Sequence, residues 1–505
     1  MFSNKTKNIF SISIFLMYIT FILFNTFYFL RTKPLKLYFR EHPTIYSIFF
    51  IIAASISCGV IIFICKKFLF KIKLDKQLPV LLLLLIVTAT PRLIWIACIK
   101  VTPLSDFNTY HIIATALAKG EFTGGSYIAL FPHYIGYPVL LAPFYMLFGS
   151  SPDVATLLNV FLSCGISLLI YCIGSNIFDK RYGLLSALIW ALWPSQIFYT
   201  ALVSTEILFT FLMLLCIYLF TRILNGRNSV FLNLIKFIFL GVVCCLTNTI
   251  RPLGLIVLIA ICLYYFIFII EKTEIKGSAF ISKTIFLSSL LVAYFITSTI
   301  VSIATSKVVG REIAKYPFGF NIYVGSNYAS NGSWNAEDAN TLTEIQKTPG
   351  ITPQEIHNEL LRLSWNRITS RSFSGNINFI YNKHSMIWPV DYESILYIKS
   401  GLIQEDIKFD FYKFESLLVK MSNFYYHTIL LLCVFGGIIL VLKKNQGLPL
   451  FLVIIILGII FLHMIVEVAG RYHFPAISIF SMLASYGICS FSDYQKTDMV
   501  LSKNK

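Results

Sequence analysis

About twelve apolar runs, each of roughly 20 residues, constrain the fold of this chain more than any other feature of its sequence. A soluble core does not require runs of this length, whereas a helix needs roughly 20 apolar residues to cross a bilayer. Hydrophobic residues make up 57% and charged residues 13% of the 505 positions. We therefore predict an all-α polytopic membrane protein. The expected spans are 9–30, 44–65, 78–98, 153–174, 183–200, 204–222, 233–249, 253–270, 284–306, 424–442, 448–466 and 473–491.

The net charge of the chain is +17, and its positive residues lie mainly in short loops between the apolar runs. Positively charged short loops mark the cytoplasmic side of a membrane protein. The positive charge is therefore explained by the orientation of the chain in a lipid bilayer, and we expect no nucleic-acid partner. With this number of spans, both termini lie on the cytoplasmic side of the cell membrane. The basic loop 31–42 falls on the other side, which leaves the first two spans the least constrained. The loops that set the orientation contain Lys66, Lys67, Lys71, Lys73, Lys76, Lys180, Arg181, Arg222, Arg227, Lys236, Lys443 and Lys444.

Two polar segments, 100–152 and 307–423, fall on the outer, extracytoplasmic face in this arrangement. The second contains 12 basic and 12 acidic residues, whereas the rest of the chain, with 29 basic and 12 acidic residues, carries the whole excess charge. This asymmetry supports the assigned sidedness. The expected parts are two N-terminal spans (1–77), a transmembrane module with the outer loop (78–306), a small mixed α/β extracytoplasmic domain (307–423), and the C-terminal spans with a short cytoplasmic tail (424–505).

Two local sequence patterns in the outer segment 307–423 predict its structure. Thr352, Pro353 and Glu355 form a capping box with proline at the first helical position, which predicts the start of a helix. The apolar face of that helix would consist of Ile356, Leu360, Leu363 and Ile368. The sequence NYASNGSWNAED at 327–338 is rich in turn-forming residues and predicts an exposed turn region.

The eleven cysteines all fall within or at the ends of apolar runs, without the spacing of a metal site. We expect them to be small apolar packing residues without outer disulfides. The chain also has no phosphate-binding loop, dinucleotide-binding fingerprint or nucleophile elbow. The sequence therefore predicts no cofactor and no metal site.

Charged residues at the outer ends of the spans are the candidates for chemistry, because a charge near hydrocarbon is costly and is retained mainly for function. The outer loop 100–152 is the most polar break between two apolar runs. It carries Asp106 shortly after a span, at the start of a predicted amphipathic helix that ends at Gly120. A second apolar helix is expected after Pro138. The candidates are Asp106, Glu121, Asp153, Glu206, Arg251, Glu467 and Arg471, with His133 and His473 beside them.

The two acids Asp106 and Glu206 each have a functional and a structural interpretation. Asp106 could be a general base that removes the proton of an attacking hydroxyl, or an N-cap of the helix that follows it. Glu206 lies at the outer start of a span, where a first-turn acid also suits the helix dipole. The local sequence leaves both alternatives open.

The arginines Arg251 and Arg471 lie at outer breaks between spans, in TNTIRPLG and VEVAGRYHFPA. An arginine in such a place can present its fork to a phosphate, or extend to the interface as an anchor. With Asp106 and Glu206 at the same membrane level, they would form a site with a base and a phosphate clamp. A metal site of His133, His473 and Glu467 is an alternative that no spacing supports.

Several motifs, taken in chain order, resemble the GT-C superfamily of integral-membrane glycosyltransferases. They are SDFNTYHIIATALAKGEF, PHYIGYPVLLAPFYMLFG, NIFDKRYGLLSALIWALWPSQIFYTALVSTEILFTFLMLLCIYLF, TNTIRPLG and GRYHFPA. Within the superfamily, the chain is similar to the branch of the protein O-mannosyltransferases and the bacterial aminoarabinose transferases. The similarity covers residues 78–272 and the last span. The sequence differs from many relatives at Phe107, where they have a second acid after the first.

The resemblance implies transfer of one sugar from a polyprenyl-phosphate donor to a cell-envelope glycan, lipid or protein at the outer face of the membrane. Asp106 and Glu206 match the two outer acids of the family and would be the catalytic residues. Arg251 matches its R-P turn, and Arg471 with Tyr472 its terminal R-Y motif; these three residues would bind the donor phosphate.

Four further residues are expected to line the donor or acceptor pocket, namely His133, Tyr134, His473 and Glu467. The alternative function is a polysaccharide polymerase or ligase, or a flippase of lipid-linked oligosaccharides. A flippase would carry charges along a central cavity in several spans, whereas the acids here gather at one face. A polymerase would differ in its donor, a diphosphate-linked oligosaccharide.

Overall fold

The computed structural model describes residues 4–31, 43–67, 77–121, 125–226, 229–270, 277–403 and 409–503, and these are nearly all helical or in short turns. Eight of the helices in this part of the chain are long and apolar enough to cross a membrane. They are α1 (Asn4–Arg31), α4 (Gln77–Cys98), α8 (Pro152–Ile177), α11 (Thr205–Asn225), α12 (Val230–Ile250), α14 (Ser278–Val309), α20 (Phe411–Leu442) and α21 (Leu448–Ile465).

The remaining predicted spans also coincide with helices, but these are bent or have apolar stretches of at most 17 residues. The helices α9 (Lys180–Ala191) and α10 (Pro194–Phe198) form a pair bent by 62° that would make a ninth span. The other three are α3 (Pro43–Lys67), α13 (Gly254–Tyr265) and α22 (Ala476–Lys503). The fold class is therefore confirmed as helical and membrane-spanning, while the number of twelve spans remains a prediction. Residues 32–42 of the predicted loop 31–42, and the residues Lys71, Lys73, Lys76 and Arg227, lie outside the described residues.

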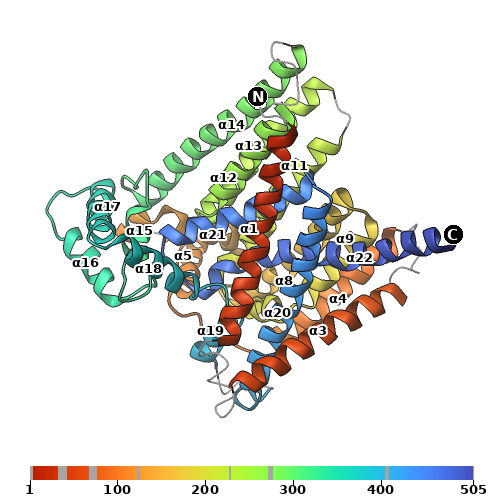
Figure 1. Ribbon diagram of the computed structural model, residues 1–505. Helices are drawn as coiled ribbons and strands as arrows, with labels where there is room; N and C mark the ends of the chain where they lie inside the picture. The colour runs from red at the N-terminus through yellow and green to blue at the C-terminus, as the bar shows by residue number, and fades with distance from the viewer. Residues whose placement is uncertain are drawn as a thin grey trace.

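The long helices pack into one bundle in which segments far apart in sequence are neighbours (Figure 1). The last helix α22 packs on α20 and α9, and α1 packs along α20. On the other side, α8 contacts α4, α9 and α11, and α14 covers α12. Because the chain returns at its C-terminal end to the middle of the bundle, the terminal R-Y motif comes close to the first outer loop.

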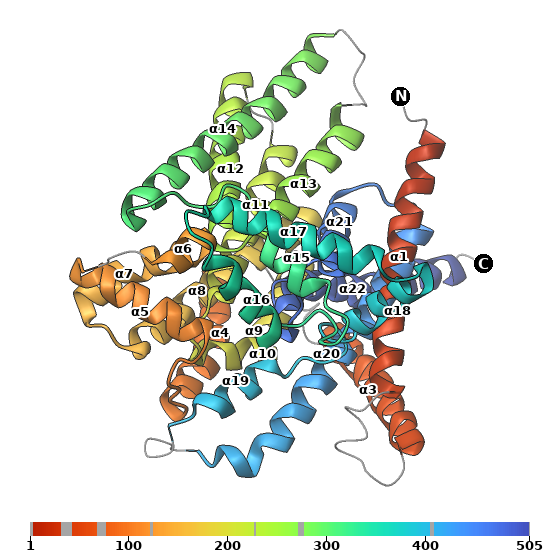
Figure 2. The same ribbon diagram turned by 90° about the vertical axis from the view of Figure 1, so that its left-hand side faces the viewer.

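The outer segment forms five short helices, α15 (Gly319–Gly325), α16 (Ala336–Gln346), α17 (Pro353–Thr369), α18 (Phe373–His384) and α19 (Glu393–Gly401). The helices α15 to α18 gather at one end of the molecule (Figure 1), and Figure 2 looks onto this end, with the outer-loop helices beside them. Within the described residues the segment has no β-strand, only the isolated bridge between Val101 and Leu402. The expected mixed α/β character is not seen there, because turns and helix caps satisfy the backbone groups instead.

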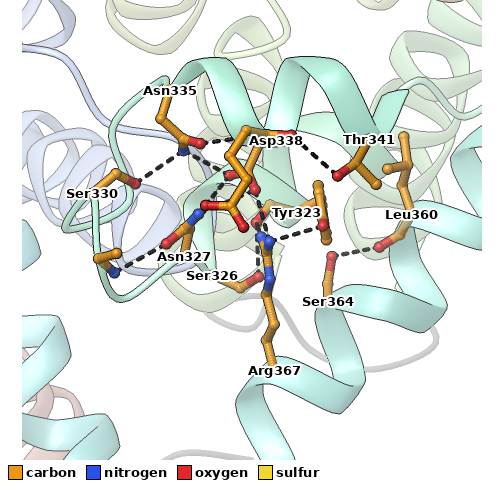
Figure 3. A network of polar contacts seen from close by, with 12 residues as sticks. Tyr323, Ser326, Asn327, Ser330, Asn335, Asp338, Thr341, Leu360, Ser364 and Arg367 are labelled. Carbon is orange, nitrogen blue, oxygen red and sulfur yellow. Dashed lines mark hydrogen bonds and ion pairs between the residues drawn. The ribbon is translucent and has the colours of Figure 1, made fainter. Parts of the chain in front are cut away.

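The two local patterns of the outer segment have different outcomes. The capping box is confirmed, since the Thr352 side chain accepts from the Glu355 amide and Glu355 accepts from the Thr352 amide at the start of α17. The turn region 327–338 is only partly exposed. Asn327 and Asp338 are buried there, because they belong to a network of polar contacts between α15, α16 and α17 (Figure 3).

The outer loop 100–152 folds as three helices, α5 (Asp106–Lys119), α6 (Ser126–Leu130) and α7 (Gly136–Phe148). Helix α5 ends at Gly120, as predicted, with the left-handed backbone angle φ of 70° that glycine adopts readily. Two backbone hydrogen bonds connect the outer segment to this loop. Thr102 donates its amide to the Gly401 carbonyl at 2.7 Å, and Ile403 donates to the Lys100 carbonyl at 3.0 Å. The position of Asp106 is thus fixed both by the bundle and by the outer helices.

Candidate active site

Asp106 is the first residue of α5, and its carboxylate points across the site instead of capping the helix. Ser105 occupies the N-cap position without a side-chain cap bond. The Tyr134 hydroxyl donates to Asp106 Oδ1 at 2.8 Å, and Arg471 donates to the other oxygen. The N-cap alternative for Asp106 is therefore wrong. Ser105 itself has φ of 52°, a conformation that costs a non-glycine residue roughly 1–3 kcal/mol and is common at functional sites.

Arg251 and Arg471 meet at one buried carboxylate, that of Glu206. Arg251 Nη1 donates to Glu206 Oε1 at 2.7 Å, and Arg471 Nε lies 3.8 Å from the same oxygen. The tight break that carries Arg251 depends on Gly254, where a Cβ atom would lie 2.6 Å from the backbone nitrogen of Asn248. The two arginines thus come from the middle and from the C-terminal end of the sequence, and both contact the Glu206 carboxylate.

Glu206 has a different position from the one expected of a catalytic residue. It is 1% exposed and does not line the cavities described below. Glu206 therefore lies behind the cavity lining, where it contacts Arg251 and Arg471; its catalytic role remains a prediction. A buried anion also reduces the cost of placing two guanidinium groups side by side.

Tyr472 lies between the charged groups. The Arg251 guanidinium is 5.0 Å and that of Arg471 5.6 Å from the Tyr472 ring centre, within the range of a cation–π contact. The Tyr472 hydroxyl donates a long hydrogen bond of 3.4 Å to Glu467. Phe107, the residue at which the sequence differs from many relatives, packs its ring 5.4 Å from Arg471. An aromatic ring in that place supports the arginine where a second acid would compete for it.

Two cavities meet at these residues, one of about 150 Å³ and one of about 430 Å³. The smaller cavity contains Arg251 and extends along apolar side chains of the spans α13 and α21. The larger cavity extends beneath the outer helices and contains Glu393 and Trp334. Both are lined by Asp106, His133, Tyr134, Asn321, Glu467, Arg471 and Tyr472. The site therefore joins an apolar chamber within the bundle to a polar chamber outside it.

The carboxyl groups at this junction differ in their acidity. Burial opposes ionisation of Asp106, but Arg471, Tyr134 and Arg251 outweigh it and hold its pKa below the usual value. Burial raises the pKa of Glu467 to about 7, against the opposing effect of Arg471. Burial and the nearby Arg251 lower the pKa of His133 to about 4, so this imidazole is neutral at pH 7. Asp106 is thus a stable anion, whereas Glu467 changes its charge near neutrality.

The other predicted residues divide into two groups. His133, Tyr134 and Glu467 line both cavities, as expected. His473 does not, because its Nε2 faces Asp391 at 3.1 Å; its assignment to the pocket is corrected. Asp391 also accepts from Trp193 at 2.7 Å and Ser195 at 2.8 Å. No sequence signal identified Asp391, which lies in the outer segment 198 residues after Trp193.

The outermost candidate acids lie away from the site. Asp153 pairs with Lys100 at 2.7 Å on the surface, and Glu121 is exposed; neither lines a cavity of the site. In the described part of the chain, no group of three or more His, Cys, Asp and Glu side chains could hold a metal ion. The alternative metal set fails because His473 faces Asp391 and not the cavity of His133 and Glu467.

The fold and site together define a multi-pass membrane protein with a charged two-chamber cavity at one end of its bundle. Residues 133–303 match the protein family described as dolichyl-phosphate-mannose-protein mannosyltransferase. This match agrees with the predicted resemblance to the protein O-mannosyltransferase branch. It includes His133, Tyr134, Glu206 and Arg251. No curated protein matches the chain.

Solved structures with some similarity include an archaeal oligosaccharyltransferase and ArnT. The archaeal oligosaccharyltransferase AglB from Archaeoglobus fulgidus, in complex with an inhibitory peptide and a dolichol-phosphate, is 12% identical with a TM-score of 0.47. That match covers 85% of this chain and 52% of the other. ArnT from Cupriavidus metallidurans bound to undecaprenyl phosphate is 11% identical with a TM-score of 0.36, over 80% of this chain and 77% of the other. The chain thus spans about half the length of the archaeal protein.

Proposed function

We propose that this protein is a glycosyltransferase that moves a single sugar from a polyprenyl-phosphate donor to an acceptor on the extracytoplasmic face of the cell membrane. The acceptor is a cell-envelope glycan, lipid or protein, and both termini are cytoplasmic. The observation that carries the proposal is that Asp106, Arg251 and Arg471 line one cavity between apolar spans and polar outer helices. Such a cavity can hold a lipid phosphate and a water-soluble acceptor at the same point.

The donor is proposed to occupy the smaller cavity. Its polyprenyl chain would enter from the bilayer between α13 and α21, whose side chains Leu253, Ile256 and Leu462 line that cavity. Its phosphate would bind the guanidinium groups of Arg251 and Arg471, which present several donors to an anion. The ring of Tyr472, which contacts both guanidinium groups, would hold them in place.

The acceptor hydroxyl is proposed to bind Asp106 from the larger cavity. Its oxygen attacks the anomeric carbon of the sugar, the bond from that carbon to the phosphate oxygen breaks, and the proton passes to Asp106. Polyprenyl phosphate leaves with its charge compensated by the two arginines. Attack from the side opposite to the phosphate inverts the anomeric centre.

Arg471 couples donor binding to the reactivity of Asp106. In the structure Arg471 donates to Asp106 and lowers its pKa, which makes the carboxylate a weak base. A donor phosphate would compete for the same guanidinium. The pKa of Asp106 would then rise, so that the base becomes effective only when the donor is present. Glu206 retains both arginines during this exchange.

Binding of defined lipids to the purified protein in nanodiscs tests the donor class. We expect undecaprenyl monophosphate to raise the melting temperature and to compete with the sugar-bearing donor in a transfer assay. Membranes that contain the protein should transfer sugar from a polyprenyl monophosphate. Chain growth only from a diphosphate-linked oligosaccharide would contradict the proposal and favour a polymerase.

A further inference from the structure

The charges in the larger cavity indicate what kind of acceptor it can hold. Three carboxyl groups, those of Asp106, Glu393 and Glu467, line this cavity together with a single guanidinium, that of Arg471. Arg251 lines only the smaller cavity. The donor phosphate would use both arginines, so the larger cavity has no cation left for a second anion. An acceptor that carries phosphate or carboxylate groups would be repelled there.

Two carboxyl groups of the larger cavity, those of Glu393 and Glu467, are available as hydrogen-bond partners for a ligand. In the described part of the chain, neither Glu393 nor Glu467 forms an ion pair with a lysine or arginine. Carboxyl oxygens are satisfied by donors, and a ligand with several hydroxyl groups supplies them without adding charge. The cavity therefore favours a polyhydroxylated ligand over an anionic one.

Aromatic side chains form most of the remaining wall. A ring face carries partial negative charge and attracts polarised C–H groups, which the pyranose ring of a sugar presents on its flat faces. A volume of about 430 Å³ lies within the usual range of small-ligand pockets. The aromatic residues of this wall are Tyr127, Phe131, Tyr134, Phe320, Trp334, Tyr397 and Tyr472.

Trp334 is the aromatic residue of this wall with the largest exposure, since 60% of its surface is accessible. This exposure leaves the indole ring accessible to a ligand in the cavity. Trp334 lies in the turn 327–338, between Gly332 and the N-cap residue Asn335 of α16. The Val468 amide donates to the Gly332 carbonyl at 2.9 Å, which ties this turn to the segment that carries Glu467 and Arg471.

A buried polar network holds the turn that presents Trp334 (Figure 3). The Asp338 carboxylate accepts from Asn327 at 3.0 Å, from Asn335 at 2.8 Å and from Arg367 at 2.7 Å. Asp338 is fully buried, and its partners come from the turn and from α17. The network makes the turn rigid, so that Trp334 is placed before a ligand arrives.

We propose that the larger cavity binds an uncharged saccharide acceptor, with Trp334 as the stacking surface at its mouth and Glu393 and Glu467 as acceptors for sugar hydroxyls. This proposal rests on the proposed glycosyltransferase function and names its acceptor class. It adds an acceptor subsite to the charged centre at Asp106 and gives the outer helices a role in choosing the substrate.

Saccharide binding without a donor tests this proposal separately from the reaction. The full chain is placed in nanodiscs free of glycoside detergents, and saturation-transfer NMR is recorded with cellotriose, chitotriose and mannotriose. Trigalacturonic acid serves as the anionic probe and a capped Ser/Thr hexapeptide as the protein-type probe. We compare the wild type with Trp334→Ala, Trp334→Phe and the matched control Trp365→Ala, an equally exposed tryptophan on α17 that does not line the cavity.

We expect at least one neutral trisaccharide to bind, with an affinity that falls about tenfold or more in Trp334→Ala and less than threefold in Trp334→Phe and Trp365→Ala. Polyprenyl-phosphate binding and the melting temperature should not change in these variants. Stronger binding of trigalacturonic acid or of the peptide than of every neutral saccharide would overturn the proposal. An equal loss in Trp334→Ala and Trp365→Ala would overturn the role of Trp334. Absence of polyprenyl-phosphate binding in the wild type would instead refute the proposed function itself.

Discussion

This protein has two buried clusters of charged and polar side chains, one around Asp338 and one around Asp106. The side chains of the first cluster are hydrogen-bonded to one another, whereas the second cluster contains buried polar atoms without a hydrogen-bond partner. Asp338 accepts from three side chains at 2.7 to 3.1 Å, and its partners Asn327, Asn335 and Arg367 have no buried polar atom without a partner in the described part of the chain. In the cluster around Asp106, by contrast, Arg471 Nε, Glu206 Oε2 and His133 Nδ1 are buried without a hydrogen bond.

The difference indicates which cluster supports the fold and which awaits a ligand. A fully paired buried network rigidifies the structure around it. Buried polar groups without partners are costly, and each of them calls for an explanation such as a catalytic role. The cluster around Asp338 is thus expected to determine stability, and the cluster around Asp106 to determine activity. Substitutions in the two clusters should therefore have different effects.

Replacement of Arg471 by alanine should have the largest effect on activity. It removes a donor to the departing phosphate, which is worth roughly 10²- to 10³-fold in rate at comparable sites, and it also removes the main counter-charge of Asp106. Arg471→Lys should recover little, because an ammonium group lacks the fork. Steady-state transfer with Arg362→Ala as the control, an exposed arginine paired with Glu359, measures this effect. Near-normal transfer in Arg471→Ala would remove the arginine from the site.

Replacement of Asp338 by alanine should chiefly reduce stability. It leaves the partly buried Arg367 without its carboxylate, a loss of about 3 to 5 kcal/mol for a buried pair. The melting temperature should fall by several degrees, while the kcat of the protein that remains folded is retained and any loss falls on the acceptor KM, because Asp338 also holds the turn that presents Trp334. The exposed pair of Glu344 and Lys347 supplies the control, since Glu344→Ala should change stability by less than about 1 kcal/mol. A loss of activity at unchanged stability would show that the two clusters are not separate.

Replacement of Glu206 by glutamine should reduce the rate by roughly 10- to 100-fold, because the amide keeps the shape of the anchor but not its charge. If Glu206 positions the arginines, the affinity for undecaprenyl monophosphate and kcat should fall together, while the acceptor KM stays the same. An increase in acceptor KM alone would instead place Glu206 in contact with the acceptor.

Replacement of Glu467 by glutamine should have the smallest effect, and it should depend on pH. Burial raises the pKa of Glu467 from 4.5 to about 7 in the folded protein, so ionisation costs stability as the pH rises through that interval. Glu467→Gln should thus be more stable than the wild type at pH 8, by about 3 kcal/mol, and the difference should shrink as the pH falls toward 4.5.

Melting curves of both proteins between pH 4.5 and 8 measure this effect. The groups that influence the Glu467 carboxyl are Arg471 and Tyr472 nearby in sequence, Asp106 on α5, Tyr127 on α6, Arg251 after α12 and Lys383 on α18. A difference that does not vary with pH would show that Glu467 keeps its charge throughout.

Much of the fold could be predicted because its signals are local. Each apolar run specifies a helix by itself, and the ends of α5 and α17 follow from Gly120 and the capping box. The fold of the outer segment was harder to predict, since its burial arises from contacts between distant residues. The sequence around Asp338 has the composition of an exposed turn. Its burial depends on the ion pair with Arg367, which lies on another helix.

The candidate site was predicted where a charge lies at the edge of an apolar run, as at Asp106, Arg251 and Arg471. Sequence could not distinguish a residue that lines the cavity from one that supports it. Glu206 and His473 have the same local pattern as Glu467, yet their partners Arg251 and Asp391 keep them away from the cavities. Trp334 carried no signal of its own, because its place depends on the packing of Gly332 against Val468.

The most direct test of the central claim is sugar transfer by the wild type and by Asp106→Asn, with a radiolabelled sugar on a polyprenyl monophosphate and native envelope acceptors. The substitution keeps the size and most hydrogen bonds of the side chain, so it isolates the charge of the carboxylate. We expect transfer by the wild type and a loss of at least about 10²-fold in the variant at equal protein level. Full activity of Asp106→Asn would contradict the assignment of Asp106 as the residue that accepts the proton.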